Sequence, residues 1–307
     1  MKYVNAIYLI LAVAIFGASY LVYFKIIESP DTIKRSEIKI LPYELTGKKD
    51  SEFLLIFLHG FPNTLRMWDG MIKTLEKEYY CLNISYPNFS EKIQLKWGLD
   101  LKDIVDLIKE TVDYVEKNTP DKRKYKKIII SHDWGAFFAY LFSQKYENYL
   151  TYMLTIDVGI GIENKFKDTL STVAYQSYLA ANFLLGGPIG KFFTKLFVRM
   201  SNSYGLSEED KERINSSWNY PYYYFWKNFL YYKKFRDNFK VTTPITYVYG
   251  TQKPFHFHNE KFLNKLRICD DCDIHSVDAD HWVMRHHQNA EFLINLIKNK
   301  IKYFMNR

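Results

Sequence analysis

The sequence of 307 residues contains only three cysteines, Cys81, Cys269 and Cys272. Cys269 and Cys272 have the spacing of a metal-binding pair, but the sequence lacks the second pair that a structural zinc site of this kind needs. They also precede an expected strand, whereas a redox pair begins a helix whose N-terminus lowers a thiol pKa. We therefore expect two reduced cysteines in a turn, and Cys81 as a residue of the core.

Internal repeats and low-complexity segments are also absent, which excludes a solenoid or a propeller. The net charge of +8 could favour an anionic partner. However, lysines are scattered among acids along the helical stretches, and no run interleaves bases with aromatics as a nucleic-acid surface would. We expect no nucleic-acid partner and a solvated surface, with a minor contribution from a membrane surface. A chain of 307 residues, of which 48% are hydrophobic and 25% are charged, is long enough for one large globular domain.

Charge is missing altogether from residues 3–24, which Lys2 and Lys25 bracket. A helix of that length spans the hydrocarbon core of a bilayer, which is about 30 Å thick. The stretch is longer than the apolar part of a usual signal peptide, so we favour an uncleaved anchor over a cleaved signal. Positive charge is denser after the stretch than before it. The sequence therefore predicts a single-pass membrane protein whose main domain is cytosolic.

Behind this stretch, strands and helices alternate in the pattern of an α/β domain. Solid apolar runs such as residues 53–58 are typical of parallel strands that are buried on both faces. The alternation gives way to helical and aromatic segments at 161–240 and resumes after them. We expect a mostly parallel sheet flanked by helices, built from 38–160 and 241–307, with 161–240 inserted as a helical lid.

Residues 131–136 read SHDWGA and lie between an expected strand and an expected helix, which is the context of a nucleophile elbow. The central position falls on Asp133, while Ser131 is a small flanking residue, so the register argues against a serine esterase. An ionised carboxylate needs no activating base and suits attack on an sp3 carbon, which gives an alkyl ester. The alternative is that Asp133 only caps the helix that follows.

Two further patterns supply what such an ester needs. His281 follows the last expected strand and precedes the final helix, where chain order places a base that can activate water. Residues 59–62 read HGFP at the end of a strand and predict an oxyanion loop. We expect the backbone N–H of Phe61 in that loop, and the N–H of Trp134 directly after Asp133, to point at the ester carbonyl of Asp133.

These motifs resemble the epoxide hydrolase and haloalkane dehalogenase branch of the α/β-hydrolase fold, over about residues 35–307. Haloalkane dehalogenases usually hold the halide between a Trp and an Asn or second Trp, and the Asn is commonly in the loop, where this chain has Phe61 without an amide. Fluoroacetate dehalogenases carry Arg where this chain has Trp134. The resemblance therefore implies an epoxide hydrolase that acts on lipophilic epoxides and needs no cofactor or metal. The anchor is similar to that of membrane-bound epoxide hydrolases, which implies the endoplasmic reticulum.

In epoxide hydrolases, two lid tyrosines hydrogen-bond the epoxide oxygen. The segment 161–240 contains many tyrosines, and we select Tyr175 or Tyr178 together with Tyr223. We expect most of the others to be core residues.

The family often places the acid that orients the histidine in the segment that corresponds to residues 250–256. This chain departs from that pattern, because these residues contain no carboxylate. Some haloalkane dehalogenases take this acid from the end of the preceding sheet strand, which makes Asp157 our candidate; alternatively, Asp157 caps a helix or loop. Two other functions stay open. One is a haloalkane dehalogenase-like carbon–halogen hydrolase, and the other is a non-catalytic, membrane-anchored relative.

Overall fold

The computed structural model describes residues 35–119, 124–162, 166–201, 203, 205–253 and 256–306. The anchor predicted at 3–24 lies outside these residues. The anchor, the membrane partner, the endoplasmic reticulum and the cytosolic orientation therefore stay predictions. Among the residues that are described, no helix is both long and apolar enough to cross a bilayer.

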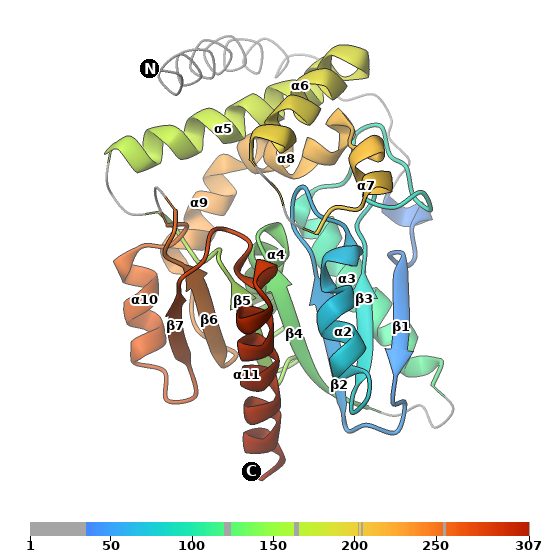
Figure 1. Ribbon diagram of the computed structural model, residues 1–307, viewed down its shortest axis with the longest axis vertical. Coiled ribbons are helices and arrows are strands. Elements are labelled where there is room, and N and C mark those ends of the chain that lie inside the picture. Colours follow the sequence, from blue (N-terminus) through green and yellow to red (C-terminus); the bar gives the residue numbers. More distant parts are fainter. Residues whose placement is uncertain are drawn as a thin grey trace.

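A seven-stranded sheet forms the centre of the molecule (Figure 1). Its strands follow one another in the order β1-β3-β2-β4-β5-β6-β7, and β1 pairs antiparallel to β3 while the other pairs are parallel. The predicted α/β class with a mostly parallel sheet is confirmed. The strands are β1 (Tyr43–Gly47), β2 (Phe53–Leu58), β3 (Tyr80–Ile84), β4 (Lys126–His132), β5 (Tyr152–Ile156), β6 (Ile245–Gly250) and β7 (Asp273–Val277).

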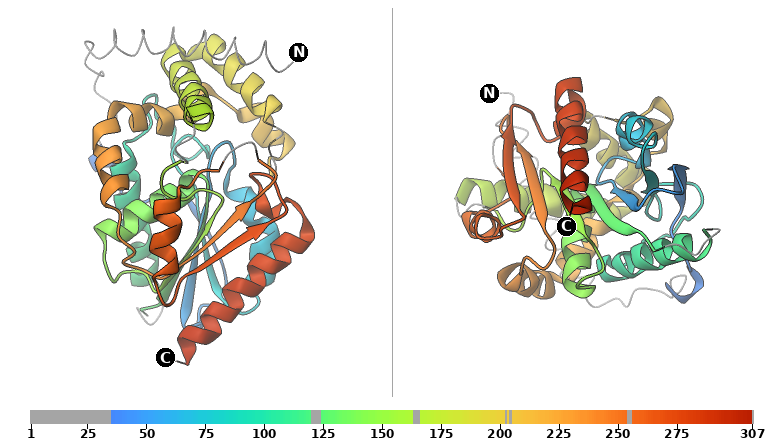
Figure 2. Two further views of the ribbon diagram at one scale, coloured as in Figure 1. Left: turned by 90° about the vertical axis from the view of Figure 1, so that its left-hand side faces the viewer. Right: turned by 90° about the horizontal axis from the view of Figure 1, so that it is seen from below.

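Helices cover both faces of this sheet, which explains why β2 is apolar at every position. Leu54 and Ile56 belong to the cluster on one face, whereas Phe53 and Leu55 belong to the cluster on the other. The first face packs against α3 (Leu101–Lys117), α4 (Trp134–Lys145) and α10 (Glu260–Arg267). The second packs against α2 (Asp69–Leu75) and α11 (His287–Met305). Figure 2 shows the sheet between these helices.

The chain between β5 and β6 forms a layer of helices beyond the carboxyl ends of the parallel strands (Figures 1 and 2). Asp100 caps α3 and connects it to this layer, because its carboxylate accepts hydrogen bonds from Asn228 Nδ2 (2.6 Å) and from Tyr232 Oη (2.9 Å). We name these helices the helical insertion: α5 (Phe166–Leu185), α6 (Gly187–Met200), α7 (Glu208–Arg213), α8 (Tyr220–Lys227) and α9 (Phe229–Asn238). The short 3-10 helices of the chain are η1 (Arg35–Glu37), η2 (Leu65–Trp68), η3 (Ser216–Asn219) and η4 (Val283–Arg285).

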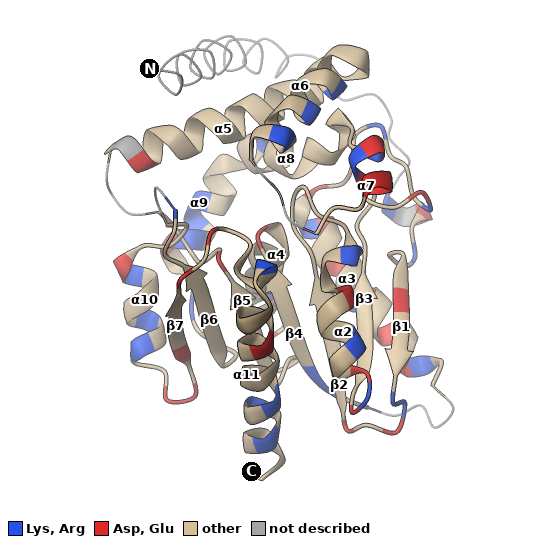
Figure 3. Cartoon of the chain, in the orientation of Figure 1, with Lys and Arg blue, Asp and Glu red and all other residues tan. Residues whose placement is uncertain are grey.

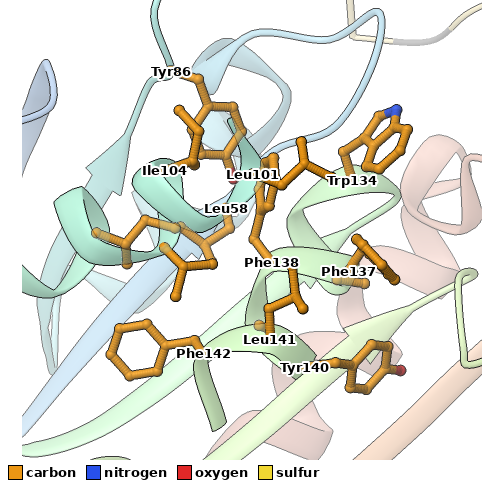
Figure 4. Close-up of a cluster of buried hydrophobic side chains, with 14 of the residues drawn as sticks. Leu58, Tyr86, Leu101, Ile104, Trp134, Phe137, Phe138, Tyr140, Leu141 and Phe142 are labelled. Atoms are coloured by element: carbon orange, nitrogen blue, oxygen red, sulfur yellow. The ribbon is translucent and has the colours of Figure 1, made fainter. Parts of the chain in front are cut away.

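Helix α4 is apolar on all sides because every side of it is covered. Its residues from Trp134 to Ser143 are all buried. Figure 4 shows Phe138 beside Leu101 and Ile104 of α3 and near the end of β2. Phe137 lies against Phe225, Tyr232 and Phe235 of the insertion. The helix that starts at the nucleophile turn is therefore fixed by the sheet, α3 and the insertion together.

The cysteine pair differs from the expectation. Cys269 and Cys272 are joined by a disulfide with an S–S distance of 2.13 Å, so the prediction of two reduced thiols is wrong for this structure. The turn between α10 and β7 brings their Cα atoms to 5.3 Å, a separation that a disulfide can bridge. Cys81 is a buried residue of β3, as predicted.

Candidate active site

Asp133 occupies a sharp turn between β4, which ends at His132, and α4, which begins at Trp134. Its backbone has φ 54° and ψ −121°, a conformation that costs energy for a residue with a side chain. The turn needs glycines around it. A Cβ on Gly135 would lie 2.2 Å from the carbonyl oxygen of Leu58, and a Cβ on Gly60 would lie 2.4 Å from Cβ of Asp133. The sequence HG…DWG therefore fits the close approach of β2, β4 and α4.

The two carboxylate oxygens of Asp133 have different surroundings. Oδ1 accepts a hydrogen bond of 2.7 Å from the N–H of Phe61, and the N–H of Trp134 also hydrogen-bonds the carboxylate. Oδ2 lies 3.6 Å from Nε2 of His281, and the side chain keeps 15% exposure. Burial raises the pKa of Asp133 above its ordinary value, although the charge of His281 and the two N–H groups oppose this. Oδ1 is thus held by the backbone of Phe61, and Oδ2 faces His281.

His281 lies between two carboxylates. Its Nε2 faces Asp133, and its Nδ1 hydrogen-bonds Oδ2 of Asp157 at 2.5 Å. A hydrogen bond fixes the loop that carries His281, because Nε2 of His132 donates to the carbonyl oxygen of His281 at 2.9 Å. Burial, followed by the charge of His281, lowers the pKa of His132 to about 3, so His132 is neutral and serves as a donor. The imidazole of His281 is therefore fixed with Nε2 directed at Asp133.

Asp157 follows β5 directly and is completely buried. Its Oδ2 contacts His281, while Oδ1 accepts hydrogen bonds from the N–H of Gly250 (3.0 Å) and from Nζ of Lys253 (2.6 Å). Burial alone would raise the pKa of Asp157, but the charge of Lys253 and the contact with His281 outweigh it, and the pKa lies below its ordinary value. Asp157, the acid predicted to orient His281, thus contacts the imidazole nitrogen that is turned away from Asp133, and it is ionised.

The sequence interpretation missed Lys253. Its side chain is only 6% exposed and forms a buried ion pair with Asp157. It comes from the segment 250–256, in which an acid was expected and none was found. The sequence did contain a signal for this pair. A lysine at a position where the family has an acid suggests that the acid lies elsewhere, close enough to form an ion pair with the lysine.

We expect the Lys253→Met substitution to shift the acid limb of the pH profile of kcat/KM to higher pH. Without the lysine charge, burial dominates and the pKa of Asp157 rises, so Asp157 becomes protonated at a pH where the wild type keeps it ionised. A protonated Asp157 no longer stabilises the positive charge that His281 acquires when it takes a proton. The matched variant Lys253→Arg keeps the charge and should keep the limb near its original position. Identical profiles for all three proteins would show that Lys253 does not control Asp157.

A cavity of about 340 Å³ opens beside Asp133. Its walls are mainly apolar and include the aromatic side chains of Trp134, Phe137, Phe225, Trp226, Phe229 and Phe257. Tyr175 of α5 and Tyr222 of α8 line it together with Asp133, and their rings lie 6.2 Å apart. Burial and then the charge of Asp133 raise the pKa of both phenols, so both are neutral O–H donors over the ordinary pH range. Nε2 of Gln176 donates to the oxygen of Tyr175 at 3.3 Å, and this bond does not use the phenol proton.

Two of the three selected tyrosines do not reach this cavity. Tyr178 donates its hydroxyl proton to the carbonyl oxygen of Phe193 at 3.0 Å, and Tyr223 packs against Phe183 at a centroid distance of 5.1 Å. The tyrosine of α8 that faces Asp133 is Tyr222. Successive side chains of a helix differ by about 100° in direction. Selecting Tyr223 in place of Tyr222 therefore chose a side chain on the wrong face of α8.

A family model described as the alpha/beta hydrolase fold matches residues 54–284. The chain therefore belongs to the α/β-hydrolase fold family. Its relatives lie in the branch that the motifs resemble. Epoxide hydrolase 1 of Caenorhabditis elegans is 22% identical over 296 residues, which are 90% of this chain and 70% of the relative. Epoxide hydrolase 3 of Mus musculus is 28% identical over 105 residues, which are 33% of this chain and 26% of the relative.

Solved structures show the same fold at lower identity. A mutant of an epoxide hydrolase from Bacillus megaterium superposes with a TM-score of 0.62 at 17% identity, over 85% of this chain and 96% of its own. A loop variant of a haloalkane dehalogenase from Bradyrhizobium elkanii gives 0.60 at 11% identity, over 85% and 94%. Both enzyme types are hydrolases, and the fold alone does not choose between them.

Proposed function

We propose that the chain is an epoxide hydrolase, which adds water to lipophilic epoxides and forms diols through an ester on Asp133. One observation carries the proposal: Oδ2 of Asp133, 3.6 Å from Nε2 of His281, lies beside a mainly apolar cavity that two neutral tyrosines also line. An epoxide needs a nucleophile at carbon and a proton donor at oxygen. Asp133 on the one hand, and Tyr175 with Tyr222 on the other, supply these two functions.

In the first step, Oδ2 of Asp133 attacks an epoxide carbon and the carbon–oxygen bond breaks. The electron pair moves to the epoxide oxygen, which receives a proton from Tyr175 or Tyr222. Because the phenols have raised pKa values, they hold their protons until the alkoxide, a stronger base, develops. The products of this step are a hydroxyalkyl ester of Asp133 and one tyrosinate.

In the second step, Nε2 of His281 takes a proton from water, and the resulting hydroxide attacks the ester carbonyl carbon. The negative charge collects on Oδ1, where the N–H of Phe61 donates to it. Asp157 stabilises the cationic imidazole. The tetrahedral intermediate then releases the diol with a proton from His281, and the second water proton restores the tyrosine. The sum is one epoxide and one water converted to one diol.

We expect the Tyr175→Phe and Tyr222→Phe variants each to lower kcat for diol formation by about tenfold, and the double variant by about 10³-fold. Each phenol can donate to the same oxygen, so a single loss is partly compensated and the double loss is not. Tyr223→Phe is the matched control, because it removes a neighbouring hydroxyl of the same helix that does not face Asp133. Diol formation from a lipophilic styrene-type epoxide is the measurement.

The same proteins should be assayed for halide release from a haloalkane of similar size. Trp134 beside Asp133 favours this alternative, since an indole N–H can bind a leaving halide; in this structure the Trp134 side chain hydrogen-bonds Tyr222. Halide release that survives in the double tyrosine variant, without diol formation in the wild type, would replace the epoxide proposal with a carbon–halogen hydrolase. If neither product forms, the non-catalytic relative is favoured.

A further inference from the structure

One charged side chain lies in the wall of the mainly apolar cavity. Arg236 of α9 is half-buried, and its guanidinium carbon lies 5.9 Å from the ring centre of Phe225, which also lines the cavity. A second cavity of about 230 Å³ adjoins the first. The two share Gly161, Ile162, Thr169 and Arg236 as lining residues. Arg236 therefore lies at the border between the cavity beside Asp133 and the second cavity.

Arg236 interacts electrostatically with its neighbour Asp237 but forms no ion pair within the described part of the chain. No described carboxylate forms an ion pair with it, and the adjacent Asp237 is paired with Lys233 at 2.9 Å instead. Burial lowers the pKa of Arg236, and the charge of Asp237 only partly opposes this. A half-buried cation that no carboxylate of the described residues pairs with is costly, and at a ligand cavity an anionic ligand can supply the missing negative charge.

The surroundings of the second cavity are also positive. Lys261 and Lys265 of α10 line it together with Arg236 and with one carboxylate, Asp237, which is paired with Lys233. Nζ of Lys261 donates to the carbonyl oxygen of Asp237 at 3.0 Å, and Nζ of Lys265 donates to that of Phe239, so both ammonium groups are held at this place. Figure 3 shows Lys and Arg on α9 and α10, at the end of the sheet where the two helices lie. The potential at this end of the site favours an anion.

We propose that Arg236 binds an oxyanion at one end of the substrate, so that the preferred epoxides have an apolar body ending in a carboxylate or phosphate group. The body would lie along the aromatic walls between Asp133 and Phe225, and the anion would meet the guanidinium, which matches oxyanions with two parallel N–H donors. The substrate class depends on the proposed epoxide hydrolysis. The binding of the anion does not, because it needs no turnover.

The first test measures binding of decanoate, decyl phosphate and decan-1-ol to the full chain by calorimetry, below their aggregation limits. We expect one of the two anions to bind at least about tenfold more tightly than the alcohol, and Arg236→Met to abolish this advantage without changing the affinity for the alcohol. Arg236→Lys should restore part of it. Decanoate and decyl phosphate compared with each other identify the anion as a carboxylate or a phosphate.

Lys234→Met is the matched control, because Lys234 is an exposed cation of the same helix that does not line either cavity. It should bind all three compounds as the wild type does. The proposal is overturned if the anions bind no better than the alcohol, if their advantage survives Arg236→Met, or if Lys234→Met removes it equally.

The second test compares an epoxide that ends in the anion identified by binding with a neutral epoxide of equal length. Arg236→Met should raise KM for the anionic epoxide by about tenfold and leave kcat unchanged, whereas both constants for the neutral epoxide should stay the same. Loss of kcat for both epoxides alike would assign Arg236 a structural role and overturn the proposal. If the wild type turns over neither epoxide but binds the anion through Arg236, the epoxide proposal fails and the anion site stands.

Discussion

Replacing Asp133 with Ala should abolish diol formation, with a fall in kcat of at least about 10⁴-fold. Oδ2 is the atom that would bond to carbon, and among the described residues lining the cavity no second carboxylate can take its place. Water alone would have to open the epoxide, with help only from the tyrosines. The fold should survive, because the substitution removes a buried carboxylate whose pKa is raised by desolvation. Diol formation and a thermal melt of the same preparation measure both effects.

Two variants separate the carboxylate from its surroundings. Asp133→Asn keeps the shape and an oxygen for the N–H of Phe61 but loses the charge, so it should be as inactive as Asp133→Ala. Ser131→Ala removes the hydroxyl that a serine esterase would need, and its activity should stay within about threefold of the wild type. Ser131 Oγ points at the carbonyl oxygen of Leu154 at 3.4 Å, away from the cavity. An active Asp133→Asn variant, or an inactive Ser131→Ala variant, would contradict the assignment of the nucleophile.

The fold and the positions of Asp133, His281 and Asp157 could be predicted because backbone geometry determines them. Parallel strands place their carboxyl ends along one edge, so residues that follow β4, β5 and β7 meet there although they are far apart in the sequence. The glycines beside Asp133 are visible in the sequence for the same reason, since the close approach of backbones forbids a Cβ. Spacing along the chain therefore contained enough information for this part of the site.

The residues that the sequence did not reveal depend on side-chain direction and tertiary packing. Tyr222 and Tyr223 are neighbours in an aromatic run with no clear polar face, so nothing local distinguishes the one that faces Asp133. Lys253 and Arg236 are ordinary surface residues by type, and only burial against Asp157 or Phe225 sets them apart. The disulfide depends on how tightly the turn after α10 closes, which the spacing of two cysteines does not determine.

Replacing His281 with Gln should stop turnover at the ester. Attack by Asp133 needs no base, so the first step should proceed in this variant. Water activation should be about 10³- to 10⁴-fold slower, because no other described side chain lies between Asp133 and Asp157 to accept the proton. A stoichiometric burst of epoxide consumption without continued diol release is the expected kinetic result. His286→Gln, which changes an exposed histidine near the start of α11, should behave as the wild type.

Mass spectrometry of the peptide that contains Asp133 completes this test. In the His281→Gln variant, the peptide should gain the mass of one epoxide. In the wild type, a single turnover in ¹⁸O-labelled water should place one ¹⁸O atom in Asp133 and none in the diol, because hydroxide attacks the ester carbonyl carbon and the diol leaves with an oxygen of Asp133. Label found in the diol after one turnover would mean that water attacks the epoxide directly. Asp133 and His281 would then act as a general base pair, and the covalent mechanism would be wrong even if both substitutions abolish activity.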